Sequence, residues 1–123
     1  AKWLDADPRV SWVSFPGLET DKYHALAEKY MPNGTCGVIS FGVPGGREKV
    51  SAFLDHLKMV SIATHVADAR SCTLYPAGTT HRQLTEEQLE EAGVGIDLVR
   101  LSCGIENTAD IIADLDQALA AVQ

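Results

Sequence analysis

The chain has 123 residues, a length that accommodates one domain with a hydrophobic core of ordinary size. Apolar residues make up 46% of it and charged residues 22%, which is typical of a soluble globular protein. The net charge of -7, without a basic cluster, argues against nucleic acid or an anionic membrane surface as a partner. No apolar run is long enough to span a membrane, and we expect no signal peptide.

The cysteine and histidine patterns argue against a metal site. The three cysteines, Cys36, Cys72 and Cys103, lie far apart in apolar or small-residue stretches, and they lack the close pairs of a structural zinc site. We interpret them as reduced core thiols, which predicts a cytoplasmic protein. The four histidines are too scattered for a metal motif. Because the chain begins with Ala1 rather than methionine, we interpret it as a processed or excised piece.

The first half of the chain predicts two units, each a strand followed by a helix. Alternating side chains predict a strand over Val10–Phe15, and apolar residues at helical spacing predict a helix over Thr20–Tyr30. A run rich in β-branched and aromatic residues predicts a strand over Gly37–Val43. An apolar stripe predicts a second helix over Arg47–Lys58.

The second half begins with two apolar stretches, which predict strands over Met59–Val66 and Ser71–Tyr75. The connection between them is too short for a helical crossover, so we predict that these two strands pair antiparallel. Thr85–Gln88 has the sequence of a capping box, which predicts a helix start, and Gly93 supplies its end.

The last part of the chain predicts a strand over Leu98–Cys103 and a helix from about Thr108 to the C-terminus. Arg100 is a charged residue in the middle of this otherwise apolar strand, on the opposite face from Val99 and Leu101. A guanidinium there needs an anionic partner, and a carboxylate matches its fork of donors. An internal ion pair with one of the 17 acidic residues is the commoner arrangement, and a ligand carboxylate is the alternative.

These elements predict a single α+β domain over residues 1–123. We expect a two-layer sandwich with a small, mainly antiparallel sheet of about four strands and helices packed on one side. No serine lies in a nucleophile elbow, no cysteine has the flanking signature of a thiol enzyme, and no lysine is a candidate for a buried Schiff base. The chain itself therefore offers no catalytic residue.

Seven short motifs follow one another in the order that they have in a known enzyme family. They are Val13–Leu18, Lys29–Gly34, Phe41–Gly46, Asp68–Ser71, Tyr75–His81, Gly93–Val94 and Val99–Glu106. Through them the chain resembles the C-terminal domain of the pyridoxal-phosphate-dependent enzymes of cysteine and methionine metabolism. This family includes cystathionine γ-synthase, methionine γ-lyase and O-acetylhomoserine sulfhydrylase.

The resemblance implies that Arg100 binds the α-carboxylate of an amino-acid substrate. In relatives a loop of this domain contributes to the same site through a serine or asparagine where this chain has His65, so the resemblance makes His65 an expected second substrate contact. Relatives also commonly carry glycine at Ala67, histidine at Tyr75 and serine at Gly78. We therefore expect the loops of this chain to differ in detail from those of its relatives.

The resemblance also implies pyridoxal phosphate as cofactor, held by a larger N-terminal domain that carries the cofactor-binding lysine. It implies a homo-oligomer and a small amino-acid substrate, and the isolated chain is expected to be inactive. Residues Ile39–Gly46 and Thr79–Leu84 most resemble the O-acetylhomoserine sulfhydrylases. The expected parent is thus a sulfhydrylase-type transferase of methionine and cysteine biosynthesis, with methionine γ-lyase or cystathionine γ-synthase or lyase as the alternative.

Two interpretations without catalysis stay open for the chain on its own. It can be a structural fragment that associates through an apolar face meant for a missing domain, or a small amino-acid-binding module. Saturable amino-acid binding that Arg100→Ala abolishes would indicate the module. A size that depends on concentration, without such binding, would indicate the fragment, which we rank first.

Overall fold

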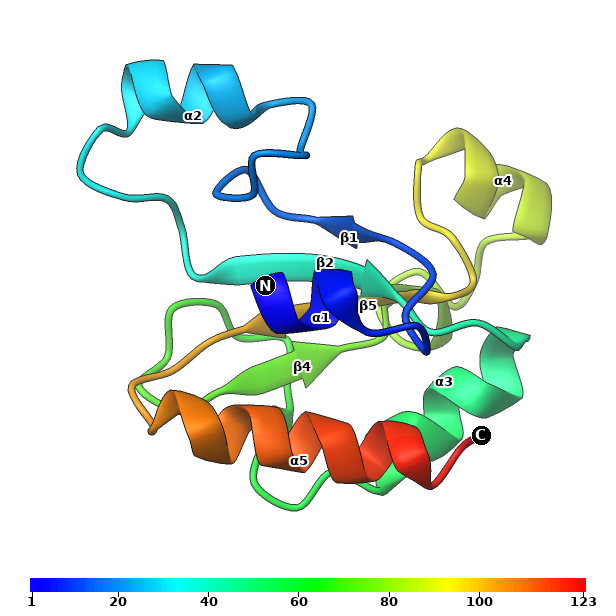
Figure 1. Ribbon diagram of the computed structural model, residues 1–123. Coiled ribbons are helices and arrows are strands. Elements are labelled where there is room, and N and C mark those ends of the chain that lie inside the picture. Colours follow the sequence, from blue (N-terminus) through cyan, green and yellow to red (C-terminus); the bar gives the residue numbers. More distant parts are fainter.

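The computed structural model describes all residues from 1 to 123, and a sheet with the strand order β1-β2-β5-β4-β3 forms its centre (Figure 1). Neighbouring strands pair antiparallel, except β3 and β4, which are parallel. The predicted α+β class with a mainly antiparallel sheet is therefore confirmed, with five strands. The strands are β1 (Val13–Ser14), β2 (Val38–Gly42), β3 (Ser61–Ile62), β4 (Cys72–Leu74) and β5 (Leu98–Ser102).

Three helices, α1, α3 and α5, pack on one face of this sheet, where their buried side chains join those of β2 and β5 in a single core. Figure 1 shows α2 outside this layer, beyond the edge strand β1, and α4 at the other end of the domain. None of the helices combines the length and the apolar character needed to cross a membrane. The helices are α1 (Lys2–Ala6), α2 (His24–Tyr30), α3 (Gly46–Asp55), α4 (Glu86–Glu91), α5 (Thr108–Ala120) and the 3-10 helix η1 (Pro76–Gly78).

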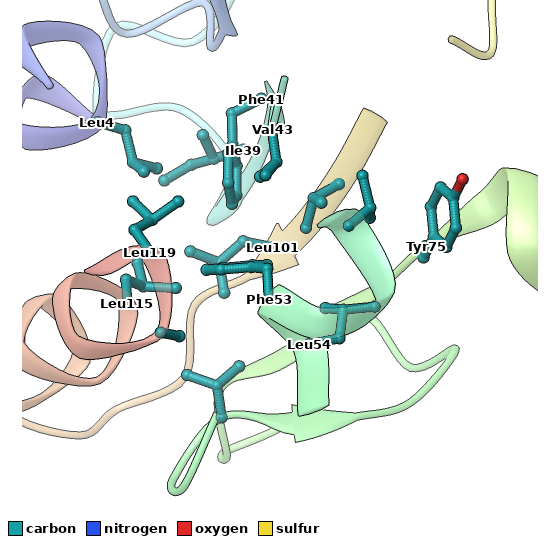
Figure 2. Packing of buried hydrophobic residues seen from close by; sticks show 14 of the residues in the cluster. Leu4, Ile39, Phe41, Val43, Phe53, Leu54, Tyr75, Leu101, Leu115 and Leu119 are labelled. Atoms are coloured by element: carbon teal, nitrogen blue, oxygen red, sulfur yellow. The ribbon is translucent and has the colours of Figure 1, made fainter. Parts of the chain in front are cut away.

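The core forms because alternate residues of the two central strands point toward the helices. Phe41 of β2 and Val99 of β5 are fully buried, and Leu101 is 1% exposed. The rings of Phe41 and Phe53 meet edge to face with their centroids 6.1 Å apart. Figure 2 shows these layers, with Leu115 of α5 and Phe53 of α3 facing the sheet. Burying each such side chain contributes roughly 1.5–3 kcal/mol, so this face of the sheet determines the fold.

The predicted antiparallel pairing of the Met59–Val66 and Ser71–Tyr75 strands is wrong. Only Ser61–Ile62 and Cys72–Leu74 are strands, and they pair parallel, with Ser61 opposite Cys72. Because β3 has only two residues, the chain has to return over a distance of about 7 Å. The nine residues 63–71 span that distance as a loop, and no helical crossover is needed.

Other predictions need smaller corrections. The predicted helix over Thr20–Tyr30 begins only at His24, because the Asp21 carboxylate accepts hydrogen bonds from backbone N–H groups and holds the preceding residues in turns. The capping box of Thr85 is confirmed in both directions. Cys36 is exposed in the loop before β2, so it is not a core thiol, whereas Cys72 is buried and Cys103 half-buried.

A buried carboxylate connects α5 to the segment that leads into β3. Asp114 is 6% exposed and accepts hydrogen bonds from the backbone N–H groups of Lys58, Met59 and Val60 at 2.8 to 2.9 Å. Burial alone would raise the pKa of Asp114, but these bonds and one from Gln117 outweigh it and lower the pKa. Its stabilising contribution is present above the ordinary carboxyl pKa of 3.8 and is lost as the pH falls through the lower folded value.

We expect Asp114→Asn to destabilise the chain, because one of the two carboxylate oxygens that accept these bonds becomes an NH2 group. Losing hydrogen bonds to a charged acceptor costs roughly 1.5–3 kcal/mol of unfolding free energy. Urea unfolding at pH 7 measures it. Asp55→Asn, at the exposed C-terminal end of α3, is the control and should leave the unfolding midpoint unchanged or slightly raised. Equal midpoints for the two variants would contradict the role of Asp114.

Candidate functional site

Arg100 lies in the middle of β5, on the face of the sheet that points away from α3 and α5. The register places it between Ser40 of β2 and Leu74 of β4. It occupies this face because its neighbours Val99 and Leu101 point into the core. The side chain is half-buried, so its stem is covered while its tip remains within reach of solvent.

The guanidinium of Arg100 is held by the main chain of a loop. Its Nη2 donates hydrogen bonds to the carbonyl oxygens of Thr64 at 3.0 Å and His65 at 3.2 Å. Its Nε is buried and has no hydrogen-bond partner. A buried polar group without a partner costs roughly 1–3 kcal/mol, and more when the group is charged. The two carbonyl groups thus orient the cation without neutralising it, and donors remain for an anion.

The commoner arrangement for such an arginine, an internal ion pair, is not present. The domain has five ion pairs, whose cations are Arg9, His24, Arg47 and Arg70. Arg100 is in none of them, although the chain has 17 acidic residues. The open face of the sheet therefore presents an unpaired guanidinium, which is a group that recognises carboxylates.

His65, the second residue singled out in the sequence, lies next to Arg100 through its backbone. Its carbonyl oxygen accepts from Arg100 Nη2 and also from the Cys72 thiol at 3.2 Å. The residue as a whole is exposed, and its imidazole makes no hydrogen bond or ion pair. The contact that the structure contains is thus the carbonyl, and a substrate contact of the side chain stays a prediction.

Sequence reasoning missed the groups that fix the loop against the sheet. The Ser102 hydroxyl accepts from the Ala67 backbone N–H at 3.1 Å, and Cys72 bonds to His65 as described. Ser102 follows Arg100 by two residues on the same strand, so it shares the face of Arg100, and this spacing was the available signal. Thr64 could not have been found, because only its main-chain oxygen takes part.

The Glu106 carboxylate fixes the far end of the loop of residues 63–71. Glu106 accepts hydrogen bonds from the Ser71 backbone N–H at 2.7 Å and the Ser71 hydroxyl at 2.8 Å. The backbone hydrogen bonds from Ser71 and from Glu106 itself, together with the Ser71 hydroxyl, hold the pKa of Glu106 below its usual value. Glu106 therefore stays ionised and tied to Ser71, so it does not act as the counter-ion of Arg100.

The other candidate regions add no chemistry to this site. No group of three or more His, Cys, Asp or Glu side chains has an arrangement that could hold a metal ion. In the Tyr75–His81 loop, Thr79 donates to the Tyr75 carbonyl and Thr80 bonds to His81. These two bonds are internal to the loop, and two others tie it to the rest of the domain: Arg47 donates to the Ala77 carbonyl and Tyr75 to the Ile96 carbonyl, each at 2.8 Å.

The fold and this site define an α+β domain with an oriented arginine that takes part in no ion pair. The sequence model for the family described as Cys/Met metabolism PLP-dependent enzyme matches residues 1–120. The chain therefore belongs to this family of pyridoxal-phosphate-dependent enzymes.

Individual relatives share much of this sequence. A homocysteine synthase of Schizosaccharomyces pombe is 48% identical over 119 residues, and an O-acetyl-L-homoserine sulfhydrylase of Leptospira meyeri is 44% identical over 120 residues. Both alignments cover 97% of this chain, but only 28% and 27% of the two relatives. The chain thus spans a little over a quarter of their length.

A solved structure agrees with this comparison. It is that of a Campylobacter jejuni protein described as an O-acetylhomoserine (thiol)-lyase, and it contains a pyridoxyl-lysine phosphate. It matches with a TM-score of 0.89 and 37% identity, covering 98% of this chain and 28% of its own. The small domain described here therefore has the same fold as part of that larger protein.

Ala67 has a φ of 58°, in the left-handed region, and it is the only non-glycine residue there. Because a Cβ makes that conformation costly, we expect Ala67→Gly to raise the unfolding free energy by roughly 0.5–1 kcal/mol. Urea unfolding measures it. The matched control is Ala69→Gly in the same loop, where φ is not positive and glycine should destabilise by a similar amount. Destabilisation by both variants would show that Ala67 is not strained.

Proposed function

We propose that this chain is the C-terminal, substrate-carboxylate domain of a longer enzyme, a pyridoxal-phosphate-dependent O-acetylhomoserine sulfhydrylase. The reaction replaces the acetate of O-acetylhomoserine with a sulfur nucleophile. The observation that carries the proposal is the unpaired guanidinium of Arg100, held by two carbonyl groups on the open face of the sheet. The names of the two relatives described above favour this reaction within the family.

In this function Arg100 binds and orients rather than reacts. Its two carbonyl contacts occupy Nη2 and its Nε is buried, which leaves the Nη1–H groups for the substrate's α-carboxylate. A charge-assisted bond of this kind fixes the amino-acid end of the substrate. The length of the substrate's own side chain then determines where its γ-carbon, which loses the acetate, lies. His65, exposed beside Arg100, is proposed as a secondary contact at the rim of the same site.

The cofactor is proposed to be bound elsewhere in the longer protein. When bound, pyridoxal phosphate supplies the electron sink of such reactions, and the protein supplies position and charge. A Schiff-base lysine is usually desolvated, which lowers its pKa. All five lysines of this chain are exposed, so its residues do not fit that role. The part assigned to this chain is therefore the carboxylate end of the substrate.

The partners follow from the same proposal. Exposed apolar side chains on and near α2, Tyr23, Leu26, Tyr30 and Met31, form a surface that suits contact with the rest of a longer protein or with other subunits of a homo-oligomer. The proposed location of the enzyme is the cytoplasm. A methionine γ-lyase or cystathionine γ-synthase is the alternative enzyme, and steady-state assays of the full-length protein with each substrate separate them.

We expect Arg100→Lys in the full-length protein to lower kcat/KM for O-acetylhomoserine roughly 10- to 100-fold. Lysine keeps the charge, but its single nitrogen cannot bind two carbonyl groups and a carboxylate in the arginine's planar arrangement, and a charge-assisted bond is worth roughly 1.5–3 kcal/mol. Steady-state kinetics at saturating sulfide measure it. Arg82→Lys is the control, because that exposed side chain makes no hydrogen bond or ion pair. An unchanged kcat/KM for Arg100→Lys would remove Arg100 from the site.

Pyridoxal phosphate provides an independent test of where the cofactor binds. After titration, borohydride reduction and dialysis, we expect the 123-residue chain to retain no stoichiometric lysine adduct. The full-length protein should retain one, on a lysine outside this chain. Absorbance and peptide mass analysis give both results. A single tight adduct on one of the chain's own lysines would refute the proposed division of the site.

A further inference from the structure

We propose that Ser102 is a positioning residue for Arg100, acting through the loop of residues 63–67, which we name the carbonyl loop. This inference rests on the proposed function and adds to it the group that sets the direction of the guanidinium. Arg100 Nη2 bonds only to the carbonyl groups of Thr64 and His65, so the guanidinium is directed by wherever these two oxygens are held.

The carbonyl loop has few other attachments. Beyond β3, the Ala63 N–H donates to the Thr73 carbonyl at 2.9 Å, which continues the pairing with β4 for one more residue. Thr64, His65 and Val66 donate no backbone hydrogen bond. The position of the two carbonyl groups therefore depends on side chains that reach the loop from the sheet.

Two such side chains lie next to each other beneath the loop. Ser102 of β5 and Cys72 of β4 are register partners, and they are 2% and 4% exposed. Ser102 accepts from the Ala67 N–H at 3.1 Å, and the Cys72 thiol donates to the His65 carbonyl at 3.2 Å. Ser102 therefore binds a backbone donor of the loop and Cys72 a backbone acceptor of it, from paired positions in the sheet.

The Ser102 anchor also accounts for the conformation of Ala67. A left-handed alanine costs roughly 1–2 kcal/mol, so it persists only where other contacts hold it. The bond from its N–H to Ser102 is the direct contact that does so. Without it, Ala67 relaxes, the preceding carbonyl groups move, and the guanidinium turns with them while its charge stays in place.

The test uses the full-length protein, with O-acetylhomoserine as the varied substrate and saturating sulfide. A misdirected guanidinium weakens binding of the carboxylate equally before and during reaction, so KM rises and kcat changes little. We expect Ser102→Ala to raise KM about tenfold with kcat within about twofold, since weakening one hydrogen bond to a charged group changes binding by about that factor. Ser102→Thr keeps the hydroxyl acceptor and should restore KM to within about threefold of the original value.

A double-mutant cycle separates positioning from a general loss of structure. In an Arg100→Ala background, Ser102→Ala should cause no further rise in KM, because the group that it directs is gone. Cys72→Ala and Cys72→Ser form a second pair, in which only the alanine variant should raise KM, and they decide the question if Ser102→Ala does not fold. An additive effect of Ser102→Ala in the Arg100→Ala background would overturn the proposal.

The two proposals fail in different ways. If Arg100→Ala leaves kcat/KM unchanged, the proposed function is refuted, and the positioning role with it. If Arg100→Ala lowers kcat/KM but Ser102→Ala and Cys72→Ala leave KM unchanged, only the positioning role is refuted. A fall in kcat without a rise in KM for Ser102→Ala also contradicts positioning of a binding group.

Discussion

The pairing of β5 with strands on both sides is the constraint on which the rest of this domain depends. Its five residues pair with β2 on one side, and three of them pair with β4 on the other. Register then dictates the two faces: Val99 and Leu101 enter the core with α3 and α5, and Arg100 and Ser102 face away. A shift of the strand register by one residue would bury the guanidinium. The packing of the core therefore also determines the face on which Arg100 lies.

The elements with strong local signals were predictable from sequence. The β-branched and aromatic run of β2, the alternation of β5, the capping box of α4 and the apolar stripes of α3 and α5 each depend on side chains close in the chain. The parallel pairing of β3 with β4 was not predictable in this way. It depends on how residues 63–71 double back, and that path is set by Ser102, Cys72 and Glu106.

The same distinction holds for the site. Arg100 stood out because a charge in an apolar strand breaks the pattern, yet the pattern could not say whether its partner was internal. The Arg100 side chain is oriented by main-chain oxygens, and no sequence pattern indicates where such oxygens lie. The resemblance to the enzyme family supplied an expected role for Arg100 where physical reasoning from sequence had left two alternatives. The unpaired guanidinium is the structural feature that favours one of them.

The use of carbonyl oxygens at residues 64 and 65 has an evolutionary consequence. Since the oxygens belong to the backbone, the side chains at these two positions can change without altering the acceptors that Arg100 needs. Both residues are exposed at the rim of the same face. The side chains at these positions can therefore diverge, and the surface beside Arg100 with them, while the backbone contacts that orient its guanidinium are inherited intact.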